Sequence, residues 1–216
     1  MPGVAKDQSY YLYGLSQDVL EHAIFPLAGF DKAEVRKIAS ENGLPAAERA
    51  ESQEICFVDG DYRDFLKTEG VDFHPGEIVD TKGNVLGHHE GTENYTIGQR
   101  RGLQVAVGHP LYVVAIDGKK GQVIVGEKEE LDRSEFLATD LRFQGLSEDE
   151  LTEEGVEVLA QIRYNSKPIE ATIYPHPEGA RVVSHEAAFA ITPGQAAVFY
   201  HPEHRYIMGG GKIKYL

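Results

Sequence analysis

The sequence predicts an α+β fold with a small helical first part, a β-rich central part and a C-terminal antiparallel β-barrel. The 216 residues have an ordinary globular composition, with 41% apolar and 26% charged residues. Near the N-terminus, apolar residues recur with the period of an amphipathic helix. From Gly76 onward, short alternating apolar runs are separated by glycine turns, which is typical of antiparallel hairpins.

The clearest predicted helix covers 32–42. Asp31 is suited to its N-cap, and Asn42-Gly43 provides a C-terminal stop. Its apolar positions share one face: Ala33, Val35, Ile38 and Ala39. Shorter elements are also expected: a turn capped by Asp7 or Ser9, a second capped turn at 15–20, a buried strand at 55–58, and a short helix from Tyr62 that ends near Gly70.

The β-rich part is expected to hold two hairpins and then a small barrel. The hairpin strands are predicted at 76–80, 84–86, 111–116 and 122–125. Six short strands with Greek-key-like spacing predict the barrel, at 157–164, 169–174, 181–184, 187–191, 196–200 and 205–208. Boundaries near His74-Pro75 and Leu131-Asp132 divide the chain into 1–74, 75–131 and 132–216.

The charge balance limits the function classes. Lysine and arginine total 21 against 35 acidic residues, so the net charge of −14 argues against broad adhesion to nucleic acid or anionic membrane. A local basic cluster remains possible, and Gln99-Arg100-Arg101 is one. No apolar run has the length of a membrane span, and the N-terminus lacks the order of a secretion signal. We expect a cytoplasmic, monomeric protein.

Cys56 is the only cysteine, which excludes an internal disulfide and a cysteine-based zinc site. It follows the polar residues 52–54 and lies near the start of the strand predicted at 55–58. One interpretation is a nucleophile, and the other is a small buried apolar residue, because free cysteine is among the most buried residue types. The sequence leaves both open.

Two polar segments have the composition of nucleic-acid contacts. Arg163-Tyr164 opens a run that ends at Lys167, with a cation, a stacking ring and short hydrogen-bonding side chains. Lys6-Asp7-Gln8 joins a cation to two groups that can read a base edge. A polar strand end explains the first equally well, and helix capping explains Asp7.

For the remaining candidate metal and phosphate sites, the sequence favours a structural role. The pairs His201/His204 and His88/His89 lack a third fixed ligand, and we expect the second pair in a surface hairpin loop, so no metal site is predicted. Gly209-Gly210-Gly211 is not followed by a helix, so close strand packing or a bulge is favoured over a phosphate cradle.

Six motifs, taken in order, resemble the bacterial tRNA-specific 2-thiouridylase family. They are Lys6-Asp7-Gln8-Ser9-Tyr10-Tyr11-Leu12, Ser52-Gln53-Glu54-Ile55-Cys56-Phe57, Tyr95-Thr96-Ile97-Gly98-Gln99-Arg100-Arg101-Gly102, Tyr112-Val113-Val114, Arg163-Tyr164, and Pro193-Gly194-Gln195-Ala196-Ala197-Val198-Phe199-Tyr200. The resemblance implies that 1–74 is the C-terminal remnant of an ATP-pyrophosphatase domain, followed by a central domain and a C-terminal barrel. The Ser-Gly-Gly-x-Asp-Ser phosphate loop and the first cysteine of the family are not in this sequence. We therefore expect this chain to be inactive alone.

The resemblance also implies roles for individual residues. Cys56 matches the cysteine that carries the persulfide. Positions that touch tRNA are matched by Lys6, Asp7, Gln8, Arg163 and Tyr164, and by Gln195 near the target base. In the family, ATP and Mg²⁺ turn the C2 oxygen of the wobble uridine into a leaving group, and the persulfide, loaded by a sulfur donor protein, then attacks C2.

We therefore predict a tRNA-uridine 2-sulfurtransferase. One alternative is a non-catalytic tRNA- or protein-binding barrel module with a structural cysteine. Another is a small redox protein that works through an intermolecular disulfide.

Overall fold

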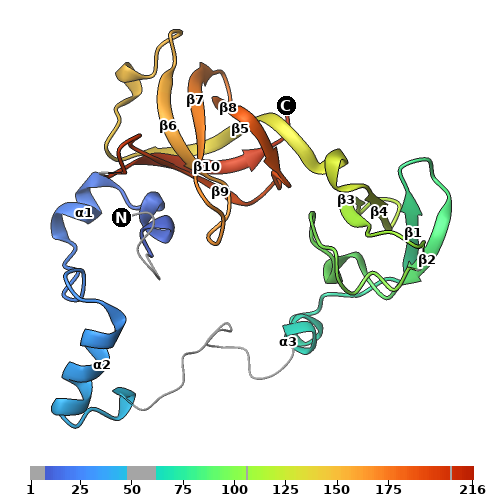
Figure 1. The fold of residues 1–216 in the computed structure, drawn as a ribbon, viewed down its shortest axis with the longest axis horizontal. Coiled ribbons are helices and arrows are strands. Elements are labelled where there is room, and N and C mark those ends of the chain that lie inside the picture. Colours follow the sequence, from blue (N-terminus) through green and yellow to red (C-terminus); the bar gives the residue numbers. More distant parts are fainter. Residues whose placement is uncertain (1–7, 48–61, 106, 205) are drawn as a thin grey trace. The chain divides into compact units, whose positions relative to one another are not determined.

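The computed structural model describes residues 8–47, 62–105, 107–204 and 206–216 (Figure 1). These residues belong to two compact units. One joins the residues up to Leu20 with Phe73–Leu216, and the other is Glu21–Asp72. The predicted strand at 55–58 lies outside the described residues.

The smaller unit contains α2 (Lys32–Glu41), the 3₁₀ turn η2 (Pro45–Ala47) and α3 (Tyr62–Thr68). The Asp31 carboxylate accepts a hydrogen bond from the Glu34 amide at 2.8 Å, and the Glu34 carboxylate accepts one from the Asp31 amide at 2.7 Å. This reciprocal pair is a capping box, so the predicted start of the helix at Asp31 is confirmed. Asn42 follows as the C-cap and Gly43 adopts φ +64°, as predicted for the C-terminal stop.

The N-terminal segment forms η1 (Ser9–Gly14) and α1 (Gln17–His22), and the boundary between the two units falls within α1. The expectation that Ser9 caps the first turn is wrong. Ser9 lies inside η1, the N-cap position is Gln8, and the Ser9 hydroxyl lies 3.4 Å from the Tyr200 hydroxyl. The second turn is capped by Ser16, whose hydroxyl accepts a hydrogen bond from the Val19 amide at 3.4 Å.

The central part is a four-stranded sheet of β1 (Gly76–Asp80), β2 (Val85–His89), β3 (Tyr112–Asp117) and β4 (Gln122–Gly126). Its spatial order is β2-β1-β4-β3. Both predicted hairpins are present as antiparallel pairs, and β1 pairs with β4 in parallel, so the sheet is mixed. The turn η3 (Thr92–Asn94) follows β2. The buried core of the sheet consists of Ile78, Leu103, Leu111, Val113, Val123 and Val125.

The expectation that His88 and His89 lie in a surface loop is wrong. Both belong to β2, and His89 is buried. Its Nδ1 accepts a hydrogen bond from the Gly91 amide at 3.1 Å, and its Nε2 lies 3.1 Å from the Gly121 carbonyl oxygen. A neutral ring protonated at Nε2 satisfies both contacts. The sequence did not indicate this role for His89, because both of its hydrogen-bond partners are backbone groups, which have no sequence signature.

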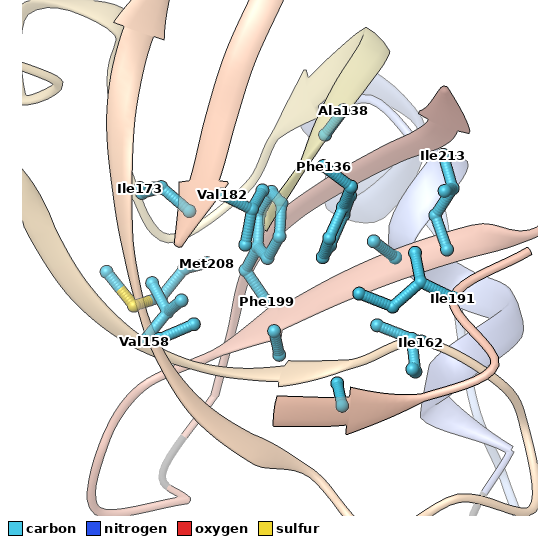
Figure 2. Close-up of a cluster of buried hydrophobic side chains, with 14 of the residues drawn as sticks. Phe136, Ala138, Val158, Ile162, Ile173, Val182, Ile191, Phe199, Met208 and Ile213 are labelled. Atoms are coloured by element: carbon cyan, nitrogen blue, oxygen red, sulfur yellow. The ribbon is translucent and has the colours of Figure 1, made fainter. Parts of the chain in front are cut away.

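The C-terminal part is a closed barrel of six strands in the order β10-β5-β8-β7-β6-β9, and every neighbouring pair within it is antiparallel. The strands are β5 (Asp132–Phe143), β6 (Val156–Gln161), β7 (Ile169–His176), β8 (Gly179–Phe189), β9 (Ala196–Tyr200) and β10 (Ile207–Lys214). The short turns η4 (Lys128–Leu131) and η5 (Glu148–Glu150) precede and follow β5. Figure 2 shows the apolar side chains from several strands that fill the interior, among them Phe136, Val158, Ile173, Val182, Phe199 and Met208.

The predicted fold class is confirmed, but the barrel strands differ in three places. The last strand, predicted at 205–208, is β10 and spans Ile207–Lys214. The predicted strands at 181–184 and 187–191 form one strand, β8. The sequence did not reveal β5, because exposed residues at 132–135 precede three consecutive buried ones, Phe136, Leu137 and Ala138. That pattern lacks the period of two on which strand prediction depends.

The strand β9 is buried on both faces. Ala197 and Phe199 belong to the interior cluster, whereas Val198 and Tyr200 belong to a second cluster with Tyr10 of η1. Consecutive residues of a strand point to opposite faces, so β9 separates the barrel core from an outer layer built by η1. A Cβ at Gly210 would lie 2.6 Å from the Tyr13 ring, so a glycine is needed where η1 approaches β10.

Candidate nucleic-acid interface

Three stretches that are distant in sequence meet beside β9. The Tyr164 ring follows β6 and lies 4.7 Å from the Tyr11 ring and 5.9 Å from the Tyr10 ring, measured between centroids. The Tyr10 hydroxyl donates a hydrogen bond to the Ala196 carbonyl at 2.8 Å. Tyr10, Tyr11 and Tyr164 therefore form one ring cluster, which we call the tyrosine cluster. The hydrogen bond of Tyr10 joins this cluster to Ala196, the residue after Gln195.

The two predicted glutamines at this site expose their side chains. Gln8 is exposed at the start of η1, and its carbonyl accepts a hydrogen bond from the Tyr11 amide at 3.0 Å. Gln195 is exposed in the turn before β9, where its amide donates to the Thr192 carbonyl at 3.3 Å and its carbonyl accepts from the Ile213 amide at 2.8 Å. Each glutamine thus has a hydrogen-bonded main chain and a side chain turned to solvent.

Arg163 is half-buried and bonded within the molecule. Its Nη2 donates to the Ile97 carbonyl at 2.7 Å, to Thr192 Oγ1 at 2.5 Å and to the Ala190 carbonyl at 3.2 Å. Its Nε is buried without a hydrogen-bond partner among the described residues. Burial lowers the pKa of the Arg163 guanidinium from its ordinary value, and Tyr10 and Tyr215 raise it. One guanidinium therefore connects a loop of the central sheet with the turn that presents Gln195.

Tyr10 is the buried member of the tyrosine cluster. Burial, together with Tyr13, Tyr11 and Tyr200, raises the pKa of the Tyr10 phenol from 10.0 to about 12. The neutral phenol is the form that donates the hydrogen bond to the Ala196 carbonyl.

We therefore expect an alkaline loss of stability that depends on Tyr10. The folded-state pKa of Tyr10 is raised, so its contribution is complete below pH 10 and disappears as the pH rises from 10 to 12, by about 2–3 kcal/mol at most. Urea unfolding of the wild type and Tyr10→Phe at pH 9 and at pH 11.5 measures it. The wild type should lose more stability between these two values than the variant. Equal losses in both proteins would contradict the assignment.

Three further predicted site residues, Lys6, Asp7 and Cys56, lie outside the described residues. In the part of the chain that the structure describes, no group of three histidine, cysteine or acidic side chains is arranged to hold a metal ion. None of the described helices combines the length and apolarity that a membrane span requires.

Sequence reasoning missed Thr192 and the packing of Tyr10 and Tyr11. The aromatic run Tyr10-Tyr11 was a local signal that a ring cluster existed, although not of its partner Tyr164. No local signal identifies Thr192, because its role comes from a bond to a residue 29 positions away.

Comparison with known proteins covers nearly the whole chain. Three family models match in order: the tRNA methyl transferase HUP domain at 3–60, the tRNA methyl transferase PRC-barrel domain at 63–127, and the aminomethyltransferase beta-barrel domain at 133–213. The tRNA-specific 2-thiouridylase MnmA of Leptospira interrogans is 47% identical over 212 residues, and that of Geobacter metallireducens is 49% identical over 211 residues. The chain belongs to the tRNA-specific 2-thiouridylase family.

Membership in the 2-thiouridylase family agrees with the observed order of a central sheet and a C-terminal barrel. The matches cover 97% and 96% of this chain but 56% of each of the two relatives, so the chain spans little more than half of their length. The family models are described by methyl transferase names, whereas the relatives are named 2-thiouridylases. The relatives carry more weight, because each of those similarities extends over 96% or more of the chain, whereas each family model matches one part of it.

Proposed function

We propose that this chain supplies the sulfur-carrying cysteine and the tRNA-binding barrel of a tRNA-uridine 2-sulfurtransferase. The reaction transfers persulfide sulfur to C2 of the ATP-activated wobble uridine of tRNA. The names of the relatives support the modification, since they are tRNA-specific 2-thiouridylases. The parts of the reaction that this chain would contribute are tRNA binding and sulfur transfer.

The convergence of Gln8, Arg163, Tyr164 and Gln195 is the observation that carries the tRNA-binding half of the proposal. The tyrosine cluster and Arg163 bring these four residues into one bonded network, although they come from three regions of the sequence. Aromatic rings stack with bases, at about 1–3 kcal/mol per base, and exposed amide side chains hydrogen-bond to base edges. Tyr11, which is 61% exposed, supplies ring surface for such stacking.

The sulfur-transfer half of the proposal assigns the role of nucleophile to Cys56. The outer sulfur of a Cys56 persulfide attacks C2, and the C2–O bond breaks as the oxygen leaves. The S–S bond then breaks when a second thiol closes a disulfide with Cys56, which provides the two electrons that the transfer requires. The sequence contains one cysteine, so the second thiol comes from outside this chain.

ATP supplies the activation of the C2 oxygen as a leaving group. The phosphate loop that the family resemblance implies for ATP is not in this sequence, and no metal-binding group occurs among the described residues. We therefore assign no ATP contact to this chain.

Direct binding of tRNA to the chain tests the proposal. A fluorescently labelled tRNA with a wobble uridine should bind with a dissociation constant of about 10⁻⁶–10⁻⁴ M at moderate salt, since the negative net charge leaves only local contacts. Tyr11→Ala should weaken binding about 10-fold, because one stacking surface is lost. The matched control is Tyr206→Ala, an exposed tyrosine outside the cluster. Absence of binding, or an equal loss in both variants, would contradict the proposed interface.

A further inference from the structure

We propose that the loop Thr96–Gly102 is a second tRNA contact, in which Arg100 and Arg101 bind backbone phosphates. We call this segment the arginine loop. The inference rests on the proposed function, because it requires that the chain binds tRNA. It extends the interface from the barrel and η1 to the central sheet.

The arginine loop has a hydrogen-bonded backbone. The Gly98 amide donates to the Val113 carbonyl at 2.8 Å, and the Val113 amide donates to the Gln99 carbonyl at 2.9 Å, which attaches the loop to β3. The Gln99 side chain closes the loop on both sides: its Oε1 accepts from the Thr96 amide at 3.0 Å, and its Nε2 donates to the Arg101 carbonyl at 2.9 Å. The loop thus has a defined shape, and Gln99 is occupied in maintaining it.

Arg100 and Arg101 remain available at the surface of this loop. Both are exposed, and neither forms an ion pair with another described residue. The chain carries 35 acidic residues, so two adjacent exposed arginines form a local positive site in a negative molecule.

The arginine loop is held against the barrel at the proposed interface. Arg163 Nη2 donates to the Ile97 carbonyl at 2.7 Å. A Cβ placed on Gly98 would lie 2.8 Å from the Ala190 Cβ and 3.6 Å from the Phe189 ring, so the loop backbone lies directly on the end of β8. The same Nη2 atom binds Thr192 Oγ1. Ile97 and Thr192 both accept a hydrogen bond from Arg163. Arg100 is three residues after Ile97, and Gln195 is three residues after Thr192. Three residues of extended chain span at most about 11 Å.

The chemistry of arginine identifies a phosphate as the ligand. A guanidinium forms two parallel hydrogen bonds to phosphate oxygens and keeps its charge at any physiological pH. Contacts to the backbone orient a nucleic acid without reading its sequence, and they supply most of the attraction at low salt. Two such contacts next to a ring cluster and an exposed amide complete an interface that both attracts and orients tRNA.

The salt dependence of tRNA binding tests this inference. The variant R100Q/R101Q should reduce the magnitude of the slope of log K against log salt by about 1.5, because each phosphate contact contributes roughly 0.7–0.9. Affinity at low salt should fall about 10-fold. R100K/R101K keeps both charges and should keep most of the slope. The matched control is K119Q/K120Q, which removes two adjacent exposed cations from the β3–β4 turn and should change the slope by less than about 0.5.

The outcomes separate this inference from the proposed function. If the wild type binds tRNA and R100Q/R101Q retains the wild-type slope, the arginine loop is not a phosphate contact, whereas the proposed function stands. The inference is also overturned if the lysine and glutamine variants lose affinity equally, because charge then has no role, or if K119Q/K120Q lowers the slope as much. If the wild type does not bind tRNA, the proposed function itself fails.

Discussion

Substitution of Cys56 by serine is expected to abolish sulfur loading of the chain completely. Cys56 is the only cysteine, so the mass of the intact protein reports on this residue alone. After treatment of the native chain with an inorganic polysulfide, the wild type should gain the mass of one sulfur atom, and Cys56→Ser should gain none. A serine hydroxyl cannot form a persulfide. In a full-length enzyme with the N-terminal domain that the resemblance implies, the same variant should form no 2-thiouridine and bind tRNA almost normally.

Two further measurements on Cys56 distinguish the catalytic proposal from the alternatives. A thiol reagent should label native Cys56 at a rate comparable to that of the urea-unfolded chain if the thiol is available for transfer. Labelling only after unfolding would favour a binding module with a structural cysteine. A Cys56-linked dimer under mild oxidation, without tRNA binding, would favour the redox alternative. Normal 2-thiouridine formation by the full-length Cys56→Ser enzyme would remove the catalytic assignment.

Substitution of Arg163 by alanine is expected to weaken tRNA binding more than any other single change in the barrel, by about 10- to 100-fold. The variant loses a cation and also releases the Ile97 carbonyl and Thr192 Oγ1, which anchor the arginine loop and the Gln195 turn. Leaving such partners unsatisfied costs about 1–3 kcal/mol. The slope of log K against log salt should therefore fall by more than the change of about 1 expected for one phosphate contact.

Two further variants separate the roles of Arg163. Arg163→Lys keeps the charge but lacks the guanidinium whose Nη2 contacts all three acceptors, so it should restore part of the salt slope and little of the affinity. Arg181→Ala is the matched control, because Arg181 is an exposed barrel arginine paired with Glu135 at 2.7 Å. An unchanged salt slope in Arg163→Ala would show that the loop after β6 faces away from the tRNA.

Local patterns predicted a large part of this fold. The helix at 32–42 was predictable because its cap, its apolar face and its stop are all local, and the structure shows the capping box that Asp31 and Glu34 form. The strand 196–200 was predicted with the observed bounds of β9. Sequence reasoning failed at β5 and at His89, where burial follows from distant partners and not from periodicity.

The sequence by itself determined the α+β class, the order of helical, hairpin and barrel regions, and the family motifs, because capping, alternation and turn chemistry depend on neighbouring residues. It also singled out Cys56, Arg163, Tyr164 and Gln195 without a spatial relation between them. Only the tertiary structure decided that Tyr164 stacks on η1 and that Arg163 binds both Ile97 and Thr192. These contacts join residues tens to more than a hundred positions apart. Closure of the barrel brings such residues together, and no local pattern specifies which donor then meets which acceptor.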